Sequence, residues 1–265
     1  MRNWQGRYES PSPITLAIVA WIPALSGYHA DALDILALTI ASARANTVTP
    51  FDILVLDNGS CGEVRRWLQD HLDRGVVNQI LLCERNIGSL NGKRLALLAC
   101  PGDTVVYSDC DVFFQPGWLE TFLSVRRAFP DAGMIGAHPG RHFKNRAQQL
   151  AAVRTTYGER DHVSTEDGDF IPEATLRSWA RSVGEDPEEF LAQYGDVPDL
   201  RVERMGVSVL AGAGHFAYCT SKEVLLTLPH HRWDRATGDV AQVIDDILDD
   251  RGVPRVSTIE PVCYH

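Results

Sequence analysis

The sequence VVYSDCDVFF, residues 105–114, places two aspartates in an otherwise apolar run. A run of this length is typical of a buried strand, so Asp109 and Asp111 are expected at its end and outside the core. Aspartates two positions apart on a strand point to the same face. At the rim of a sheet they would offer hard oxygen ligands to Mg²⁺ or Mn²⁺. The alternative is a capping aspartate followed by a turn aspartate.

Strand and helix patterns alternate on either side of this stretch. The predicted strands are 14–23, 51–57, 77–84 and 104–114, and the predicted helices are 28–45, 62–75 and 88–100. This alternation predicts an α/β protein with a parallel sheet and helices on both faces. Ligands of such sheets bind at the carboxyl ends of the strands, where Asp57 and the Asp109–Asp111 pair fall.

The second half of the chain is less regular. Helices are predicted at 116–130 and 237–252, and strands at 132–139, 207–220 (one or two) and 254–265. Residues 140–205 look helical and polar, and the acidic stretch STEDGD, 164–169, looks like a loop. Because no repeat or long linker is evident, we expect a single domain with a nucleotide-binding half, about 14–115, and an acceptor half, about 116–265.

Composition and net charge disfavour some classes of binding partner. The 265 residues carry a formal net charge of −10, which disfavours nucleic acid or an anionic membrane as the main partner. Six cysteines without a C-x-x-C pair argue against zinc or a disulfide framework and favour a reducing compartment. No signal peptide or spanning segment is visible. A cytoplasmic protein is therefore expected, with peripheral attachment to the inner face of the membrane left open.

The stretch ERNIGSLNGKRLAL, residues 84–97, combines a glycine-bearing turn with the start of a helix. Asn86 and Gly88 end the preceding strand, and glycine allows close backbone approach. Helix N-termini favour phosphate, and Lys93 and Arg94 would add positive charge against a diphosphate. The stretch is neither a P-loop nor a G-x-G-x-x-G motif. An ordinary turn is the competing interpretation.

Three further patterns admit a structural and a functional interpretation. Asp57 in LVLDNGS fits ordinary turn chemistry, or accepts hydrogen bonds from a base edge or ribose. Gly212 and Gly214 lie inside a strand pattern, where glycine is costly unless a ligand approaches the backbone or a bulge forms. His215 beside them is a weak candidate for a substrate contact.

The remaining candidates for catalytic or metal-binding roles are carboxylates of the late helix and the final histidine. Asp239 falls at the predicted helix start, where it would either cap the helix or act in catalysis. Asp245 and Asp246 lie further along, on a mainly solvated face. The imidazole of His265 is a plausible extra metal ligand beside two carboxylates.

Together these motifs occur in an order that resembles the GT-A-fold glycosyltransferases, most closely the family 2-like enzymes. The resemblance extends from about residue 14 to 265. It is most specific at Asp57, at 86–97 and at 109–118. It implies a Rossmann-like, mixed and mostly parallel sheet flanked by helices.

The resemblance also implies roles for individual residues. Asp57 would recognise the nucleotide base, Asp109 and Asp111 would hold a divalent metal on the diphosphate, and His265 would complete the coordination. Pro23, after the first strand, and Cys110, between the two aspartates, belong to the implied donor site. The catalytic base is a carboxylate near the start of the late helix, with Asp239 as first choice and Asp245 or Asp246 as alternatives.

The implied reaction is transfer of a sugar from a UDP- or GDP-sugar to the hydroxyl of an unknown acceptor, which is a glycan, a small molecule or lipid-linked. A metal would act on the leaving diphosphate and a carboxylate would take the acceptor proton, with inversion at the anomeric carbon. A sugar nucleotidyltransferase is one alternative. A glycine- and arginine-rich loop is usual after its first strand, and no arginine occurs in AWIPALSGYHAD. A non-catalytic nucleotide-sugar-binding module is the other.

Overall fold

The computed structural model describes residues 10–143, 145–226 and 240–265. The strands are β1 (Ile14–Ala20), β2 (Asp52–Asp57), β3 (Gln79–Leu82), β4 (Thr104–Asp109), β5 (Phe113–Phe114), β6 (Met134–Gly136), β7 (Val163–Gly168), β8 (Asp199–Arg204), β9 (Val207–Ala211), β10 (Ala217–Ser221), β11 (Arg255–Thr258) and β12 (Cys263–Tyr264). The helices are η1 (Gly27–His29), α1 (Ala32–Ala45), α2 (Gly62–Asp73), α3 (Ser89–Ala99), α4 (Trp118–Ala128), α5 (Arg146–Tyr157), α6 (Glu173–Ser182), α7 (Pro187–Tyr194), α8 (Lys222–Leu226) and α9 (Val240–Asp250).

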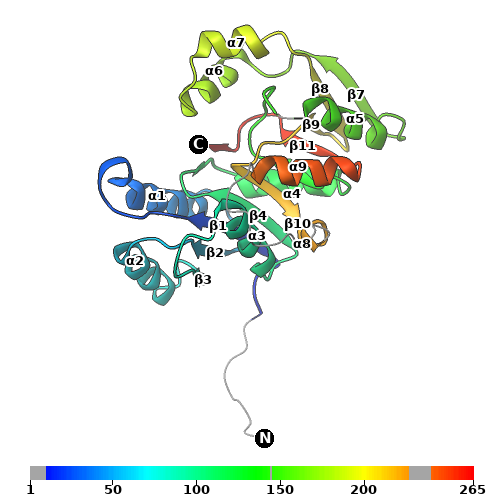
Figure 1. The fold of residues 1–265 in the computed structure, drawn as a ribbon. Coiled ribbons are helices and arrows are strands. Elements are labelled where there is room, and N and C mark those ends of the chain that lie inside the picture. Colours follow the sequence, from blue (N-terminus) through cyan, green and yellow to red (C-terminus); the bar gives the residue numbers. More distant parts are fainter. Residues whose placement is uncertain (1–9, 144, 227–239) are drawn as a thin grey trace, which may run out of the picture.

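One sheet runs through the whole molecule in the order β3-β2-β1-β4-β10-β6-β11-β9-β8-β7 (Figure 1). The first four strands in this order pair in parallel, as the alternating strands and helices predict. Beyond β4 the pairing is antiparallel, except between β6 and β11. The predicted mixed sheet is confirmed, with its parallel part concentrated in the first half.

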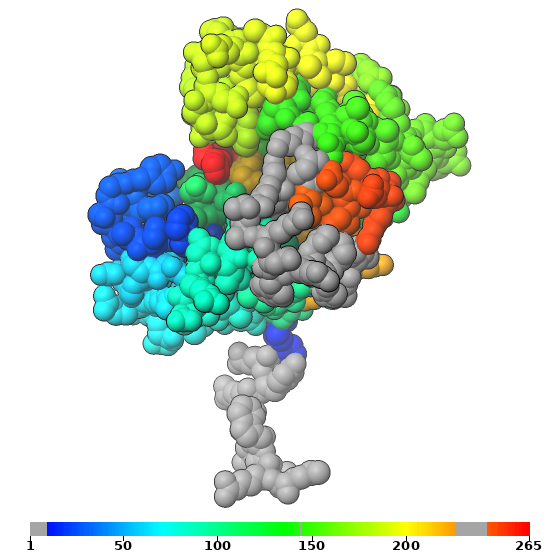
Figure 2. Space-filling view, in the orientation of Figure 1, coloured from blue at the N-terminus to red at the C-terminus, as the bar shows by residue number. Residues whose placement is uncertain are grey.

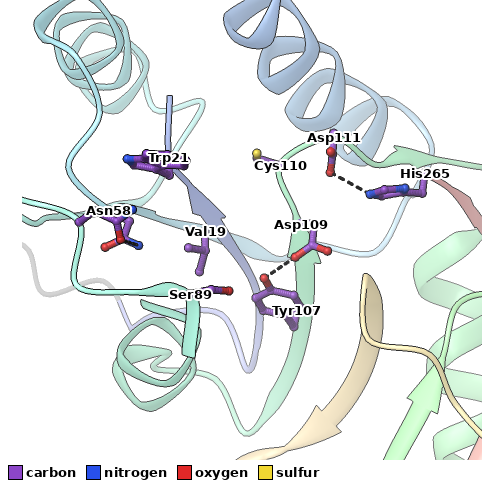
Figure 3. Close-up of a pocket in the computed structure, with 10 residues that line it drawn as sticks. Val19, Trp21, Asn58, Ser89, Tyr107, Asp109, Cys110, Asp111 and His265 are labelled. Carbon is purple, nitrogen blue, oxygen red and sulfur yellow. Dashed lines mark hydrogen bonds and ion pairs between the residues drawn. The ribbon is translucent and has the colours of Figure 1, made fainter. Parts of the chain in front are cut away.

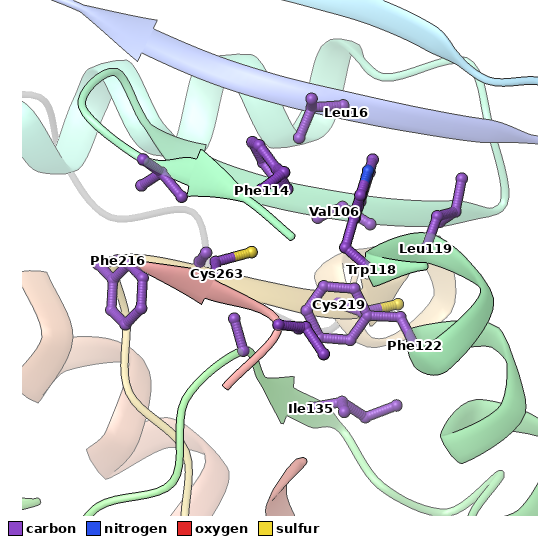
Figure 4. Close-up of a cluster of buried hydrophobic side chains, with 14 of the residues drawn as sticks. Leu16, Val106, Phe114, Trp118, Leu119, Phe122, Ile135, Phe216, Cys219 and Cys263 are labelled. Atoms are coloured by element: carbon purple, nitrogen blue, oxygen red, sulfur yellow. The ribbon is translucent and has the colours of Figure 1, made fainter. Parts of the chain in front are cut away.

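Alternate residues of β1 pack on opposite faces of the sheet, which explains why the strand is apolar throughout. Leu16 and Ile18 join the cluster that contains side chains of α1, α2 and α4. Ala17 joins the cluster on the other face, formed with α3 and α9. Figure 4 shows the first cluster around Trp118, which is fully buried. Both faces of the central strands are therefore covered, and charged side chains can reach solvent only at the strand ends.

The region predicted as helical and polar also contains two strands. Its helices α5, α6 and α7 are accompanied by β7 and β8, which pair antiparallel at the edge of the sheet. The STEDGD stretch lies almost wholly within β7, so its assignment as a loop is wrong. Backbone pairing to β8 and an ion pair between Glu166 and Arg201, opposite each other in the register, hold this charged edge strand.

The C-terminal segment forms two short strands in different sheets, where one strand is predicted. β11 pairs within the large sheet, and β12 pairs with β5 in a separate two-stranded ribbon. The break falls at 259–262, which contains Pro261, a residue without a backbone N–H to donate. Figure 2 shows the chain end, in red, at the surface between α1 and the α6–α7 region. Among the described residues, no helix combines the length and apolarity needed to cross a bilayer.

Candidate active site

The carboxyl ends of β2, β1 and β4 lie side by side at one edge of the sheet. The register pairs Ala20 with Asp57 on one side of β1 and Val19 with Asp109 on the other. A cavity of about 280 Å³ opens at this edge (Figure 3). It is lined by Val19, Trp21, Asn58, Asn86, Ser89, Tyr107, Asp109, Cys110, Asp111 and His265. Five segments that are separated in the sequence therefore meet where the parallel strands end.

Asp109 is held from inside the protein. The hydroxyl of Tyr107 donates a hydrogen bond of 2.5 Å to its Oδ1 atom. Burial raises the pKa of Asp109, and the positive charge of Lys93 together with this hydrogen bond only partly offsets the effect. A cation in the cavity would favour the ionised form of such a carboxylate.

Asp111 and His265 face each other across the cavity mouth. The Nε2 atom of His265 lies 3.5 Å from Oδ1 of Asp111, and their side chains are 29% and 49% exposed. The β5–β12 ribbon brings the chain end here, because Tyr264 pairs with Phe113, two residues after Asp111. The predicted proximity of His265 to the aspartate pair is present, and both side chains can be reached from solvent.

A divalent metal needs several oxygen or nitrogen ligands. Among the described residues, no group of three or more His, Cys, Asp or Glu side chains is arranged as a complete metal site. Asp109, Asp111 and His265 do line the same cavity. Mg²⁺ and Mn²⁺ accept carboxylate oxygens, and Mg²⁺ commonly takes only one or two carboxylates plus waters and substrate phosphates. The residues present fit a metal whose coordination a diphosphate completes.

The loop between β3 and α3 is fixed to the end of β2 by amide side chains. Asn58 donates from Nδ2 to Oδ1 of Asn86 at 3.1 Å and accepts at 3.0 Å from the N–H of Ile87. Gly88 has a positive φ of 88° and donates to the same Asn86 oxygen at 2.8 Å. Ser89 then begins α3 at the cavity wall. This arrangement presents a helix N-terminus to the cavity, a favourable setting for phosphate.

Lys93 lies one turn into α3 and is buried beside the cavity wall. Its Nζ atom donates to the carbonyl of His215 at 3.3 Å and lies 4.0 Å from the centroid of the Tyr107 ring. Arg94 is half-buried and is not among the cavity-lining residues. Of the two predicted diphosphate contacts, Lys93 is therefore the nearer in geometry, because it touches a side chain that lines the cavity.

Cys110 lines the cavity between the two aspartates. Burial, followed by the charges of Asp111 and Asp109, raises the pKa of its thiol to about 12. The thiol therefore stays protonated at neutral pH and is a poor metal ligand and nucleophile.

Asp57 and Pro23 do not line this cavity. Asp57 is fully buried, and its carboxylate accepts hydrogen bonds from the Ser60 N–H at 2.8 Å and from Nε of Arg65 at 3.0 Å. Its neighbour Asn58 lines the cavity instead. Pro23 is exposed in the loop after β1. The turn interpretation of Asp57 thus describes its contacts in this structure.

The late-helix carboxylates differ in their contacts. Asp239 lies outside the described residues. The Oδ1 atom of Asp245 lies 2.6 Å from Nη1 of Arg255 and 2.9 Å from Nε2 of His215. Asp246 is exposed and accepts from Nδ2 of Asn145 at 3.0 Å. Asp245 and Asp246 do not line the cavity, and His215 pairs with Asp245 through its ring.

Packing within the protein explains the glycines between β9 and β10. Gly212 has a φ of 103°, and a Cβ atom there would lie 2.8 Å from the ring of Phe143. A Cβ atom on Gly214 would also meet Phe143, at 3.3 Å. The close approach predicted for a ligand is thus made by a side chain of the protein itself.

Five cavity-lining residues are absent from the sequence-based prediction: Val19, Trp21, Asn58, Ser89 and Tyr107. Tyr107 carried a usable signal, because it lies two positions before Asp109 and so shares its face of the strand. Trp21 and Asn58 directly follow strands whose carboxyl ends were expected to form the site. Strand register, which decides their proximity, is not encoded locally.

Comparison with known proteins identifies the family of the chain. The chain matches the sequence model described as Glycosyl transferase family 2 over residues 28–175, more than half of its length. Among solved structures, a mannosyltransferase from Pyrobaculum calidifontis in complex with GDP-Man and Mn²⁺ has 13% identity and a TM-score of 0.54. That match covers 98% of this chain and 60% of the other. No curated protein sequence matches the chain.

A shorter match is the S. aureus TarS 1–349 structure in complex with UDP-GlcNAc. It has 15% identity and a TM-score of 0.37, and it covers 50% of this chain and 37% of that one. At these identities the likeness concerns the fold alone. The near-complete match to the mannosyltransferase confirms the predicted GT-A fold. With more than half of its residues matched by the family model, the chain belongs to glycosyl transferase family 2.

Proposed function

We propose that this protein is a metal-dependent, inverting glycosyltransferase that moves a sugar from a UDP- or GDP-sugar to an acceptor hydroxyl. The observation that carries the proposal is the convergence of Asp109, Asp111 and His265 on one cavity at the strand ends, with Lys93 packed behind its wall. The nucleotides are suggested by the solved structures, one bound to UDP-GlcNAc and another to GDP-Man. Residues about 14–115 would serve the donor and about 116–265 the acceptor.

Asp109, Asp111 and His265 are the residues that would hold Mn²⁺ or Mg²⁺ together with the diphosphate of the donor. When bound, the metal supplies Lewis acidity toward the leaving diphosphate oxygens. Lys93 adds a positive charge on the same side, and the N-terminus of α3 adds backbone N–H groups. Asn86 and Gly88 shape the loop that would approach the donor. Cys110 would contribute from the cavity wall, and Arg94 and Pro23 would contribute at the margin of the donor site.

Asp57 would act on the nucleotide base through the loop that it stabilises. Its carboxylate fixes the turn at Ser60, and the adjacent Asn58 reaches the cavity. We propose that Asn58 makes the polar contact there and that Asp57 holds it in place.

Asp239 is our choice for the base that takes the proton of the acceptor hydroxyl. Support comes from the contacts of the two alternative carboxylates, Asp245 and Asp246, which already have partners in the protein. Asp245 is buried, and its carboxylate is already engaged by Arg255 and His215. Asp246 is exposed and bonded to Asn145, outside the cavity.

The test is sugar transfer by purified protein with Mn²⁺ and a panel of UDP- and GDP-sugars. Asp239→Asn should keep donor binding and lose on the order of 10²–10⁴ in transfer rate, the usual contribution of a general base. Asp246→Asn is the matched control and should stay near the wild-type rate. Near-wild-type transfer by Asp239→Asn would contradict the assignment of the base.

A parallel assay with a nucleoside triphosphate and a sugar 1-phosphate separates the two alternative functions. From these substrates a nucleotidyltransferase would form a sugar nucleotide and release pyrophosphate, whereas the proposed enzyme would release a nucleoside diphosphate from the sugar nucleotide. A non-catalytic binding module would bind donor and release neither product. The anomeric configuration of the product, read by NMR, would test inversion directly.

A further inference from the structure

Tyr107 contacts two groups of opposite charge with two parts of one side chain. Its hydroxyl donates to Oδ1 of Asp109 at 2.5 Å, and its ring face lies 4.0 Å from Nζ of Lys93. The residue is only 2% exposed, yet it lines the cavity (Figure 3). A phenol donates a hydrogen bond to an anion at its edge, and its ring face attracts a cation. One side chain therefore contacts both a carboxylate and an amine of the site.

We propose that Tyr107 is a positioning residue of the donor site, an inference that rests on the proposed metal-dependent transfer. By donating to Oδ1, the phenol fixes the rotation of the Asp109 carboxylate and leaves Oδ2 available to a cation. By its ring face, it keeps the amine of Lys93 beside the expected position of the diphosphate. Both groups are thus oriented before metal and donor arrive, which lowers the ordering cost of binding.

Core packing alone does not require the hydroxyl of Tyr107. Its ring stacks on Tyr218, with centroids 5.3 Å apart and an interplanar angle of 28°. A phenylalanine would keep that stack and the ring face next to Lys93. The hydroxyl adds the bond to Asp109, a charge-assisted contact of the stronger kind. Its position two residues before Asp109 on β4 places both side chains on the same face.

Two isosteric variants separate positioning from packing. Tyr107→Phe removes the hydroxyl that bonds Asp109, and Tyr218→Phe removes a hydroxyl from the other ring of the stack. We would titrate Mn²⁺ into each variant with saturating UDP or GDP, following free Mn²⁺ by electron paramagnetic resonance. Tyr107→Phe should weaken Mn²⁺ binding about tenfold, the size expected for losing one hydrogen bond to a charged group. Tyr218→Phe should stay within twofold of wild type.

Thermal unfolding without metal measures the intrinsic stability of each variant. The melting temperature of each variant is then compared with and without Mn²⁺ and nucleotide, so that a change in intrinsic stability is not mistaken for a change in affinity. Equal weakening in both variants would assign the effect to packing and overturn the inference. Wild-type affinity in Tyr107→Phe would also overturn it, while leaving the proposed function intact. Absence of Mn²⁺ binding by the wild-type protein with either nucleotide would overturn both proposals.

Discussion

Asp111 and Asp199 each face a basic side chain, but in different surroundings. Asp111, at the cavity mouth, is 49% exposed and lies 3.5 Å from His265. Asp199 on β8 is 2% exposed and pairs with Arg141, whose side chain is also 2% exposed. The first carboxylate is open to solvent, whereas the second is committed to the fold. Burial, rather than residue type, distinguishes these two carboxylates.

The surroundings of Asp199 belong to an outer segment, which we define as residues 138–143 and 145–204. Asp199 accepts from Nε of Arg141 at 2.9 Å and from the N–H groups of Phe170 and Ile171 at 2.9 and 3.0 Å. Burial raises the pKa of Asp199, but these hydrogen bonds outweigh it and the net pKa is lowered. These contacts connect two loops of the outer segment, at Arg141 and at 170–171, to the start of β8.

The largest expected effect on stability follows from removing Arg141. Arg141→Met leaves the buried carboxylate of Asp199 without the guanidinium that bonds it and with Arg146 nearby, at 3.7 Å. This should lower the free energy of unfolding by about 3–5 kcal/mol. Chemical denaturation measures this loss. The matched control is Arg201→Met, which removes an exposed pair with Glu166 and should cost at most about 1 kcal/mol. Equal losses of unfolding free energy in the two variants would show that burial does not make one ion pair more important for stability than the other.

A smaller effect should come from acid. Burial lowers the pKa of His138 to about 4, and burial with the charges of His138 and Arg146 does the same for His142. Between about pH 6.5 and 4 the unfolded chain binds more protons at these sites than the folded one. The free energy of unfolding should therefore fall as pH drops through this window, by at most about 3 kcal/mol for His138.

Denaturation curves at several pH values would measure that slope, and His138→Phe should flatten it. Carboxylates also begin to titrate near pH 4, so the comparison of wild type with variant isolates the histidine. An identical slope in His138→Phe would contradict the assignment. Neither histidine lines the active-site cavity, so nucleotide binding at pH 7 should be unchanged in the variant.

The contrast between the regions also explains what the sequence could predict. The strands β1, β2 and β4 have local apolar patterns, so their existence as buried parallel strands and the placement of Asp109 and Asp111 at strand ends followed from the residues. β7 is exposed and charged, and only its pairing with β8 defines it as a strand. Arg141 and Asp199 are 58 positions apart, and nothing in either neighbourhood indicates their partnership. Long-range pairing is the information that a local pattern lacks.

Asp111→Asn provides the most direct test of the central claim, that the rim carboxylates Asp109 and Asp111 bind a metal-bound nucleotide. Because the side chain is 49% exposed, the change should alter stability by less than about 0.5 kcal/mol. An amide is a poorer ligand for a hard cation, so calorimetric titration of Mn²⁺ with UDP or GDP present should show a loss of affinity of at least about tenfold. Asp250→Asn, an exposed change outside the cavity, should bind like wild type. Unchanged Mn²⁺ affinity in Asp111→Asn would contradict the account.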